Sequence, residues 1–219
     1  MRVLPYGDRA VLVDLADPEE GDPTRAAERV VAWVDAAAVA WPDVPVELVP
    51  AATTVLVALL PGAPQDVGWL ATAVAGVRPG QPARGQEAPR TVEVPVTYDG
   101  ADLAAVAGRT GLDEAGVVAA HTGTPWRVAF GGFAPGFAYL VGGDPRLAVV
   151  PRRTEPRTRV PAGSVALAGG FSGVYPRASP GGWQLLGRTD LAMWDLDRDP
   201  PALLAAGTTV RFVDAGGRP

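Results

Sequence analysis

The sequence predicts two domains of different class, a small α+β domain followed by a β-rich barrel or sandwich. Three observations support this prediction. Positions 1–80 alternate between strand and helix patterns in the order β-α-β-β-α. A segment of proline, glycine and polar residues follows at 81–90, and short apolar runs separated by glycine and proline fill most of the rest. We therefore expect domains at 1–80 and 91–215, joined by a linker at 81–90.

The first domain begins with a strand pattern at Ala10–Leu15. Asp22-Pro23 then combines a favourable N-cap with a proline suited to the first helical position, so a helix is expected to start there. Two strands at Val46–Val49 and Thr54–Leu60 can pair as a hairpin, and a second helix is predicted at Asp66–Val74. This order indicates a small α+β fold, ferredoxin-like if one more strand follows the second helix.

The second domain opens with a strand at Thr91–Thr97, which is expected at a sheet edge because Pro95 cannot donate to a ladder. Two short helices follow, one ending at Gly108 and one capped by Asp113 and ending near His121. Later apolar runs predict strands at Arg127–Phe130, Phe137–Val141, Leu147–Val150, Ser164–Ala168, Gln184–Leu186 and Thr209–Val213. Strands of this length and spacing indicate a β-barrel or sandwich.

Composition excludes several classes of function. The chain has no cysteine, so disulfides, thiolate metal sites and a cysteine nucleophile are absent. All 19 basic residues are arginine, which excludes a P-loop lysine and a Schiff-base lysine. A net charge of −5 argues against nucleic-acid binding, and a single histidine supports no metal site. Because no apolar run reaches the length of a signal peptide or membrane span, we expect a cytoplasmic protein without membrane contact.

Three segments of the second domain combine glycine, proline and aromatic residues in unusual runs. Glycine reaches backbone angles closed to other residues and lets a ligand approach the main chain, and aromatic rings supply flat contact surface. Composition alone favours the alternative that these are tight barrel corners with aromatic plugs. The segments are Gly-Gly-Phe-Ala-Pro-Gly-Phe-Ala-Tyr-Leu at 131–140, Arg-Thr-Arg-Val-Pro-Ala-Gly-Ser-Val-Ala at 157–166, and Gly-Gly-Phe-Ser-Gly-Val-Tyr-Pro at 169–176 with Ser-Pro-Gly-Gly-Trp at 179–183 and Leu-Gly-Arg-Thr at 186–189.

Together with the opening run at 7–13, these segments resemble the KipI family of 5-oxoprolinase components, also called allophanate hydrolase subunit 1. The resemblance covers nearly the whole chain. It implies a small α+β N-terminal domain and a cyclophilin-like β-barrel. It also implies a non-autonomous subunit of an ATP-dependent enzyme that opens 5-oxo-L-proline to L-glutamate. The implied partners are a KipA-type subunit, which is a homologous second barrel, and a LamB-type subunit, with ATP as the cofactor of the complex.

One motif departs from the family pattern. Where relatives usually read Gly-Gln-Thr-Gly, this chain has Phe171 and Ser172 at the middle positions. An aromatic ring thus replaces an amide that could orient a polar substrate, which leaves the exact substrate open. The family also implies two alternatives, a regulatory module that inhibits a sensor histidine kinase and a subunit of an allophanate or urea amidolyase. Proline isomerase activity would rest on fold analogy alone.

His121, the only histidine, is the candidate catalytic residue. Its unperturbed pKa near neutrality suits acid/base chemistry, and a position at a helix C-terminus would favour the protonated form. The family commonly has a histidine followed by a hydroxyl residue here, which Thr122 matches. The equally weighted alternative is a structural histidine that caps the helix or bonds a carbonyl group in the core.

Arginines are the candidate ligands for a small carboxylate substrate, because guanidinium groups match carboxylate and phosphate geometry. The candidates are Arg146, Arg152, Arg153, Arg157 and Arg159. Arg157 and Arg159 are preferred because they lie next to a motif, whereas a solvated rim is at least as good an interpretation for Arg152 and Arg153. Among nearby carboxylates, Glu155 and Asp144 are candidates, although Asp144 before a proline is typical of a turn. The predicted substrate-binding set is Gly132, Phe133, Phe137, Tyr139, Arg157, Arg159, Ser164, Gly170 and Ser172.

Overall fold

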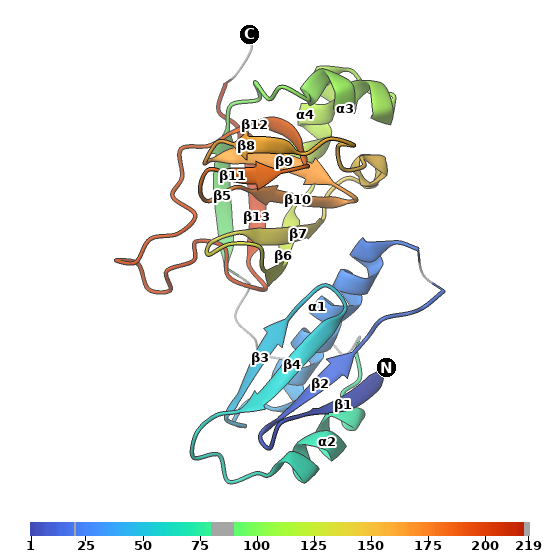
Figure 1. Ribbon diagram of the computed structural model, residues 1–219, viewed down its shortest axis with the longest axis vertical. Coiled ribbons are helices and arrows are strands. Elements are labelled where there is room, and N and C mark those ends of the chain that lie inside the picture. Colours follow the sequence, from blue (N-terminus) through green and yellow to red (C-terminus); the bar gives the residue numbers. More distant parts are fainter. Residues whose placement is uncertain (20, 80–89, 217–219) are drawn as a thin grey trace. The chain divides into compact units, whose positions relative to one another are not determined.

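A computed structural model describes residues 1–19, 21–79 and 90–216 of the 219-residue chain. Its contacts divide the chain into two units, Met1–Ala88 and Pro89–Pro219 (Figure 1). The linker predicted at 81–90 lies outside the described residues except for Arg90. None of the helices in the described ranges combines the length and the apolar character that crossing a membrane would need.

The first unit is a four-stranded antiparallel sheet with two helices (Figure 1). Strands β1 (Arg2–Tyr6), β2 (Ala10–Asp14), β3 (Val46–Pro50) and β4 (Thr54–Leu59) pair in the order β1-β2-β4-β3. Helix α1 (Pro23–Ala40) follows β2, and helix α2 (Val67–Gly76) follows β4. Alternate residues of β2 and β4 point toward the helices, so Val11, Val13, Val55 and Val57 form one apolar core with Trp33 and Leu70.

Several predictions for the first unit are confirmed. The Asp22 side chain caps α1 by accepting from the Thr24 N–H at 2.9 Å, and Pro23 takes the first helical position. The predicted hairpin forms between β3 and β4. Strand β1 was not predicted, because it is mostly exposed and contains Pro5, so it shows no alternation. The ferredoxin-like fold required a strand after the second helix. No strand follows α2 among the described residues of this unit, and β1 occupies the edge of the sheet next to β2.

The second unit is built on a seven-stranded sheet that curls into a nearly closed barrel (Figure 1). The sheet order is β12-β9-β10-β7-β6-β13-β5, and a separate two-stranded ribbon pairs β8 with β11. The strands are β5 (Thr91–Val96), β6 (Trp126–Gly131), β7 (Ala138–Gly142), β8 (Arg157–Val160), β9 (Ser164–Ala168), β10 (Phe171–Val174), β11 (Ser179–Gly181), β12 (Gln184–Arg188) and β13 (Thr209–Asp214).

The two ends of the seven-stranded sheet meet in a backbone seam. Thr97, directly after β5, pairs with Arg188 at the end of β12, and each N–H donates to the other residue's carbonyl oxygen at 2.9 Å. The chain then continues along β12, where the Gly100 N–H donates to Leu186 at 3.0 Å. The expected barrel is thus confirmed as a nearly closed sheet, which fits a cyclophilin-like barrel, and β5 holds the predicted edge position.

Helices α3 (Leu103–Thr110) and α4 (Glu114–Gly123) pack against each other and against the barrel core (Figure 1). Two local predictions are wrong. Helix α3 passes Gly108 and ends at Thr110, and the residue that caps it, Gly111, has a φ of 72° in the left-handed region that favours glycine. Residues 147–150 do not form a strand, because the Asp144 side chain caps a 3-10 helix, η1 (Pro145–Val149), that begins with proline. Strands β10 and β11 were missed because glycine and proline interrupt their alternation, and β8 was missed because its four residues are mostly polar and exposed.

The seam predicts a contrast between two glycine substitutions. A Cβ atom at Gly187 would lie 2.3 Å from the Thr97 carbonyl oxygen, whereas at Gly108 it would meet no atom within 4 Å. We expect Gly187→Ala to lower the free energy of unfolding by about 1–3 kcal/mol through overpacking. Gly108→Ala should raise it by about 0.5–1 kcal/mol, because glycine is unfavourable inside a helix. Urea denaturation measures both, and equal midpoints for the two variants would contradict a tightly closed seam.

Candidate functional site

His121 lies inside the barrel, at the centre of a chain of hydrogen-bonded side chains. It belongs to the last turn of α4 and is fully buried. Its Nδ1 lies 2.7 Å from the Tyr98 hydroxyl, and its Nε2 lies 2.9 Å from Oγ of Ser172 on β10. The Ser172 hydroxyl in turn reaches the Ala166 carbonyl oxygen at 3.4 Å. Every donor has an acceptor when the imidazole proton is assigned to Nε2, so Tyr98 donates to Nδ1 and Nε2 donates to Ser172.

Aromatic rings enclose the imidazole. Phe212 stacks on it with a centroid distance of 4.2 Å, and the Trp126 indole N–H donates to the His121 backbone oxygen at 3.0 Å. Burial lowers the pKa of His121 to about 3, because the charged ring would lose its hydration without gaining a carboxylate. The expectation of a protonated histidine at the helix end is therefore wrong, since this desolvation outweighs the helix dipole. His121 is neutral, and both of its ring nitrogens are engaged by protein side chains.

The opposite face of the same strands carries an aromatic cluster. None of its rings belongs to the apolar core around His121, because successive residues of a strand point to opposite faces. On β10, Ser172 points into the barrel while Phe171 packs edge-on against Phe130 and Tyr139. The ring that departs from the family pattern is thus part of this cluster, and Ser172 still provides a hydroxyl to His121. The cluster consists of Phe130, Phe133, Phe137, Tyr139, Phe171, Tyr175 and Trp183.

Phe133 is the exposed member of the aromatic cluster. Its side chain is 58% exposed, and its φ of 64° is a left-handed conformation that costs a residue other than glycine on the order of 1 kcal/mol. The loop around it is held by backbone bonds from the Phe137 N–H to Ala134 at 2.9 Å and from the Gly132 N–H to Phe137 at 3.2 Å. Strain together with an exposed aromatic ring indicates a position that contacts another molecule.

Asp102 organises the arginines beside the aromatic cluster. Its buried carboxylate accepts from Arg153 and Arg157 at 2.8 Å each and from the Leu185 N–H at 2.7 Å. Burial raises the pKa of Asp102, but the hydrogen bonds from Arg157 and Leu185 and the charges of both arginines outweigh burial and hold the pKa below its usual range. Asp102 stands at the N-cap position of α3 without making a cap bond, because its side chain binds the arginines instead.

Tyr175 is the member of the aromatic cluster that lies near the arginines. Burial raises the pKa of the Tyr175 hydroxyl, while a bond from the Trp183 backbone and the charges of Arg152 and Arg157 oppose that rise. Arg157 and Arg159 are two positions apart on β8, so their side chains leave the same face of that strand. Arg159 is exposed and forms no ion pair with the described residues.

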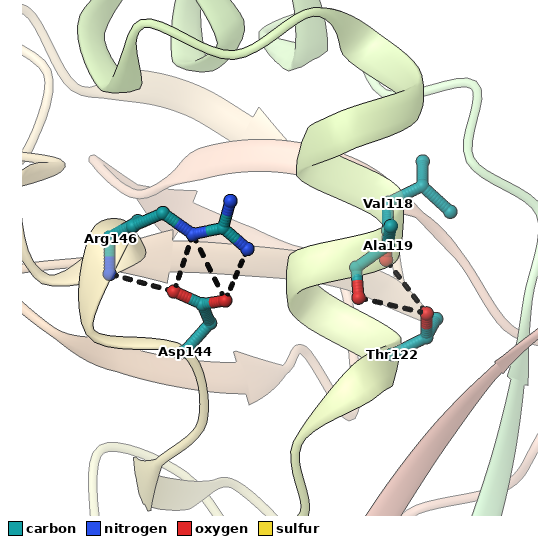
Figure 2. Close-up of polar contacts among 5 residues, drawn as sticks. All are labelled: Val118, Ala119, Thr122, Asp144 and Arg146. Atoms are coloured by element: carbon teal, nitrogen blue, oxygen red, sulfur yellow. Dashed lines mark hydrogen bonds and ion pairs between the residues drawn. The ribbon is translucent and has the colours of Figure 1, made fainter.

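Figure 2 shows three polar residues near η1 and α4 that form local hydrogen bonds. Arg146 holds the Asp144 carboxylate through its guanidinium group, and Asp144 also accepts the Arg146 backbone N–H at 2.9 Å. Asp144 is therefore the turn former that its sequence position indicated. The Thr122 hydroxyl donates to the Val118 carbonyl oxygen of its own helix at 2.8 Å. The bonds of all three side chains serve local structure.

The predicted site residues fall into two groups separated by the barrel wall. His121 and Ser172 meet inside the barrel, and Ser164 is buried at the start of β9. Phe137 and Tyr139 belong to the aromatic cluster on the other face, as does Phe133, with Gly132 in its loop. Gly170 forms the turn between β9 and β10 with a φ of 81°. Arg157 and Arg159 lie on β8.

Sequence reasoning missed Tyr98 and Asp102. Tyr98 directly follows a predicted strand, and Asp102 was interpreted only as the start of a helix. Their partners lie 23 positions away for Tyr98 and 51 or more for Asp102, so no local pattern connects them. Tyr98 also lines a cavity of about 690 Å³ beside α3 and α4, with Glu114 and Asp214 among its other walls.

Comparison with known proteins identifies related sequences. The family described as carboxyltransferase domain, subdomain C and D, matches residues 1–204. The B subunit of 5-oxoprolinase from Escherichia coli O157:H7 is 53% identical over 127 residues, which are 57% of this chain and 58% of that protein. Its counterpart from Bacillus subtilis strain 168, also named as the 5-oxoprolinase B subunit, is 47% identical over 127 residues, 57% of this chain and 52% of that protein. The chain therefore spans little more than half the length of these curated relatives.

Solved structures share the fold. A protein called TTHA0988 is 37% identical with a TM-score of 0.70, over 96% of this chain and 40% of that one. The conserved protein PH0987 from Pyrococcus horikoshii is 36% identical with a TM-score of 0.55, over 99% and 98% of the two chains. The urea amidolyase of K. lactis is 18% identical with a TM-score of 0.60, over 97% of this chain and 15% of that one. At that identity the likeness concerns the fold alone.

The buried histidine predicts a pH dependence of stability. Unfolded histidine titrates near 6.5, whereas the folded pKa of His121 is about 3. Between these values the unfolded chain binds more protons, so the stability that neutral His121 contributes is present above about pH 6.5 and is lost as the pH falls. His121→Gln keeps a donor and an acceptor without titrating. As the pH falls, the unfolding free energy of His121→Gln should decrease less than that of the wild type. The difference between the two should grow by up to about 1.4 kcal/mol per pH unit. Urea unfolding at several pH values between about 4 and 8 checks this, and parallel curves for variant and wild type would contradict it.

Asp102 predicts a contrast between a buried and an exposed ion pair. Asp102→Asn removes the charge that faces Arg153 and Arg157 but keeps an oxygen for the Leu185 N–H. We expect it to lower the unfolding free energy by about 2–4 kcal/mol, because the guanidinium groups are only partly exposed. Asp99→Asn, which breaks the more exposed pair with Arg188, should cost under about 1 kcal/mol. Chemical denaturation compares the two variants. Equal losses of unfolding free energy would contradict a larger contribution from the buried Asp102 ion pairs.

Proposed function

The chain belongs to the carboxyltransferase domain family, subdomain C and D, and from that premise we propose that it is a subunit of a 5-oxoprolinase, an amide-bond hydrolase that opens 5-oxo-L-proline to L-glutamate. The observation that carries the proposal is the identity of 44–53% to three curated 5-oxoprolinase components of the same type. A cytoplasmic location forms part of the proposal.

The chemistry beside the aromatic cluster supports a small cyclic carboxylate as the ligand. Rings such as Tyr139, which is half-buried, and Phe133, which is exposed, offer flat apolar contact for the five-membered lactam. The guanidinium of Arg159, exposed on β8, can pair with the substrate carboxylate, and Arg157 is held in place by Asp102. We assign substrate binding to this surface, with Gly132 and the turn at Gly170 shaping its loops.

The same geometry supports a site that other subunits complete. The polar residues predicted to act on the substrate, His121, Ser164 and Ser172, are all buried. His121 is neutral with both nitrogens engaged, so it acts in this proposal as a positioning residue that holds strand β10. The groups that cleave the amide bond are then supplied by the KipA-type and LamB-type partners.

ATP is proposed for the complex and not for this chain alone. A P-loop requires a lysine, and the sequence contains none. Arginines can also hold phosphates, but Arg153 and Arg157 are bound to Asp102, and Arg146 is bound to Asp144. These residues do not fit a nucleotide site of the P-loop kind. The likeness to a urea amidolyase is compatible with the allophanate or urea alternative without favouring it, and no described contact favours histidine kinase inhibition.

Reconstitution tests the proposed function. The purified chain should release negligible glutamate from 5-oxoproline by itself. Glutamate release should appear when its KipA-type and LamB-type partners and ATP are added. Allophanate and urea serve as comparison substrates. Undiminished glutamate release from a mixture that lacks this chain would contradict the function.

Two arginine variants test the binding surface within the reconstituted enzyme. Arg159→Ala should raise KM for 5-oxoproline about tenfold or more, because a charge-assisted bond to the carboxylate is lost. Arg211→Ala, at an exposed position on β13, should leave KM unchanged. Equal KM values in both variants would assign the carboxylate to another part of the complex.

A further inference from the structure

The segment between β12 and β13 forms an arm that leaves the barrel (Figure 1). Met193 and Leu204 anchor it, because both side chains are buried in the barrel core. Between these anchors Trp194 and Ala202 pair in an antiparallel bridge, and the Leu203 N–H donates to the Met193 carbonyl oxygen at 2.9 Å. The arm is therefore a hairpin-like projection with a defined base.

The arm displays large apolar side chains. Leu196 is 79% exposed, Trp194 is 40% exposed, and Leu191 is 36% exposed. Scattered apolar residues are ordinary on a protein surface, but three within six positions of one projection indicate a contact surface.

The base of the arm lies against the motif loop that presents Phe133. A Cβ atom at Gly136 of that loop would lie only 2.8 Å from Cβ of Trp194. A cavity of about 330 Å³ is lined by residues 131, 132 and 134–137 of the loop and by Trp194, Ala202 and residues 204–206 of the arm. A molecule bound at the base of the arm therefore lies beside the loop that carries Phe133, whose backbone is strained and whose ring is exposed.

Carboxylates lie between and beside the apolar residues along the sequence of the arm. The run 190–199 contains four aspartates and one arginine. Arg198 lies 3.9 Å from Asp195, whereas Asp190, Asp197 and Asp199 form no ion pair with the described residues. An apolar centre with an acidic rim is complementary to an apolar groove edged by basic side chains.

We propose that Leu191, Trp194 and Leu196, with the aspartates at 190, 197 and 199, form a docking face for a second protein subunit that presents an apolar groove edged by arginine or lysine. This inference rests on the proposed function, in which a partner completes the site beside the aromatic cluster. The structural relative TTHA0988 is consistent with it, since this chain matches only 40% of that chain and the remainder is additional protein joined to the same fold.

A matched pair of variants tests the apolar centre. Leu196→Asp places a charge at the tip of the arm, and Val149→Asp does so at another exposed position of the same unit, in η1. Binding to the immobilised KipA-type barrel protein should weaken at least tenfold for Leu196→Asp and change less than twofold for Val149→Asp. Both side chains are exposed, so neither change should alter the thermal unfolding temperature.

A second variant tests the acidic rim. Replacing Asp190, Asp197 and Asp199 by asparagine should slow association with the same partner several-fold at low salt and leave dissociation nearly unchanged. Because salt screens the attraction between exposed charges, the association rate of the wild type should fall with ionic strength more steeply than that of the variant.

Four outcomes would overturn the docking face. They are absence of binding by the wild-type chain, binding that Leu196→Asp leaves intact, self-association in ultracentrifugation that Leu196→Asp abolishes, and a lowered unfolding temperature for Leu196→Asp. The third would assign the face to a second copy of this chain, and the fourth would show that Leu196 is covered within the chain itself. Loss of binding in Leu196→Asp with no 5-oxoproline cleavage by the wild-type complex would overturn the proposed function and leave the docking face standing.

Discussion

The second unit depends on the backbone seam between Thr97 and Arg188, which joins the two ends of the seven-stranded sheet. The seam leaves no room for a side chain at Gly187, and it brings the chain after β5 alongside β12. Two functional consequences follow within five residues. Tyr98 is placed beside His121, and the Asp102 carboxylate receives the Leu185 N–H together with two arginines. Closure of the barrel therefore sets both the interior polar chain and the exterior arginine arrangement.

Strand β10 separates two environments across one backbone. On the inner side, Ser172 and Tyr98 satisfy both nitrogens of a neutral His121, so a polar group is buried without a charge. On the outer side, Phe171 joins an aromatic cluster that presents Phe133 to its surroundings. The interior chain holds the strand, and the exterior cluster exposes the ring of Phe133. In the proposed function this exterior surface binds and orients the ligand, and the partner subunits supply the reactive groups.

The aromatic cluster and the arm together form one region suited to assembly with a partner. The arm packs on the loop of Phe133 at Gly136, so a partner held by Leu196 and Trp194 reaches the place where the substrate is proposed to bind. In the proposed docking face, apolar contact would supply affinity, and the aspartates would supply orientation and speed of association. Binding of the substrate and recruitment of the partner would then be properties of neighbouring surfaces on one barrel.

Sequence patterns alone determined the class of both units, the helix cap at Asp22, the hairpin of β3 and β4, and the family, because these depend on residues close together or on motifs in a fixed order. They also singled out His121, Phe133 and Arg157. Tertiary structure decided what these residues do. The barrel wall placed Ser172 and Phe171 on opposite faces, and burial made His121 neutral where a helix end alone would favour its charge. Asp102 became the partner of two arginines more than fifty positions away. Hydrogen bonds over such separations, and the desolvation that follows from closure, exist only once the chain has folded, so no local pattern contains them.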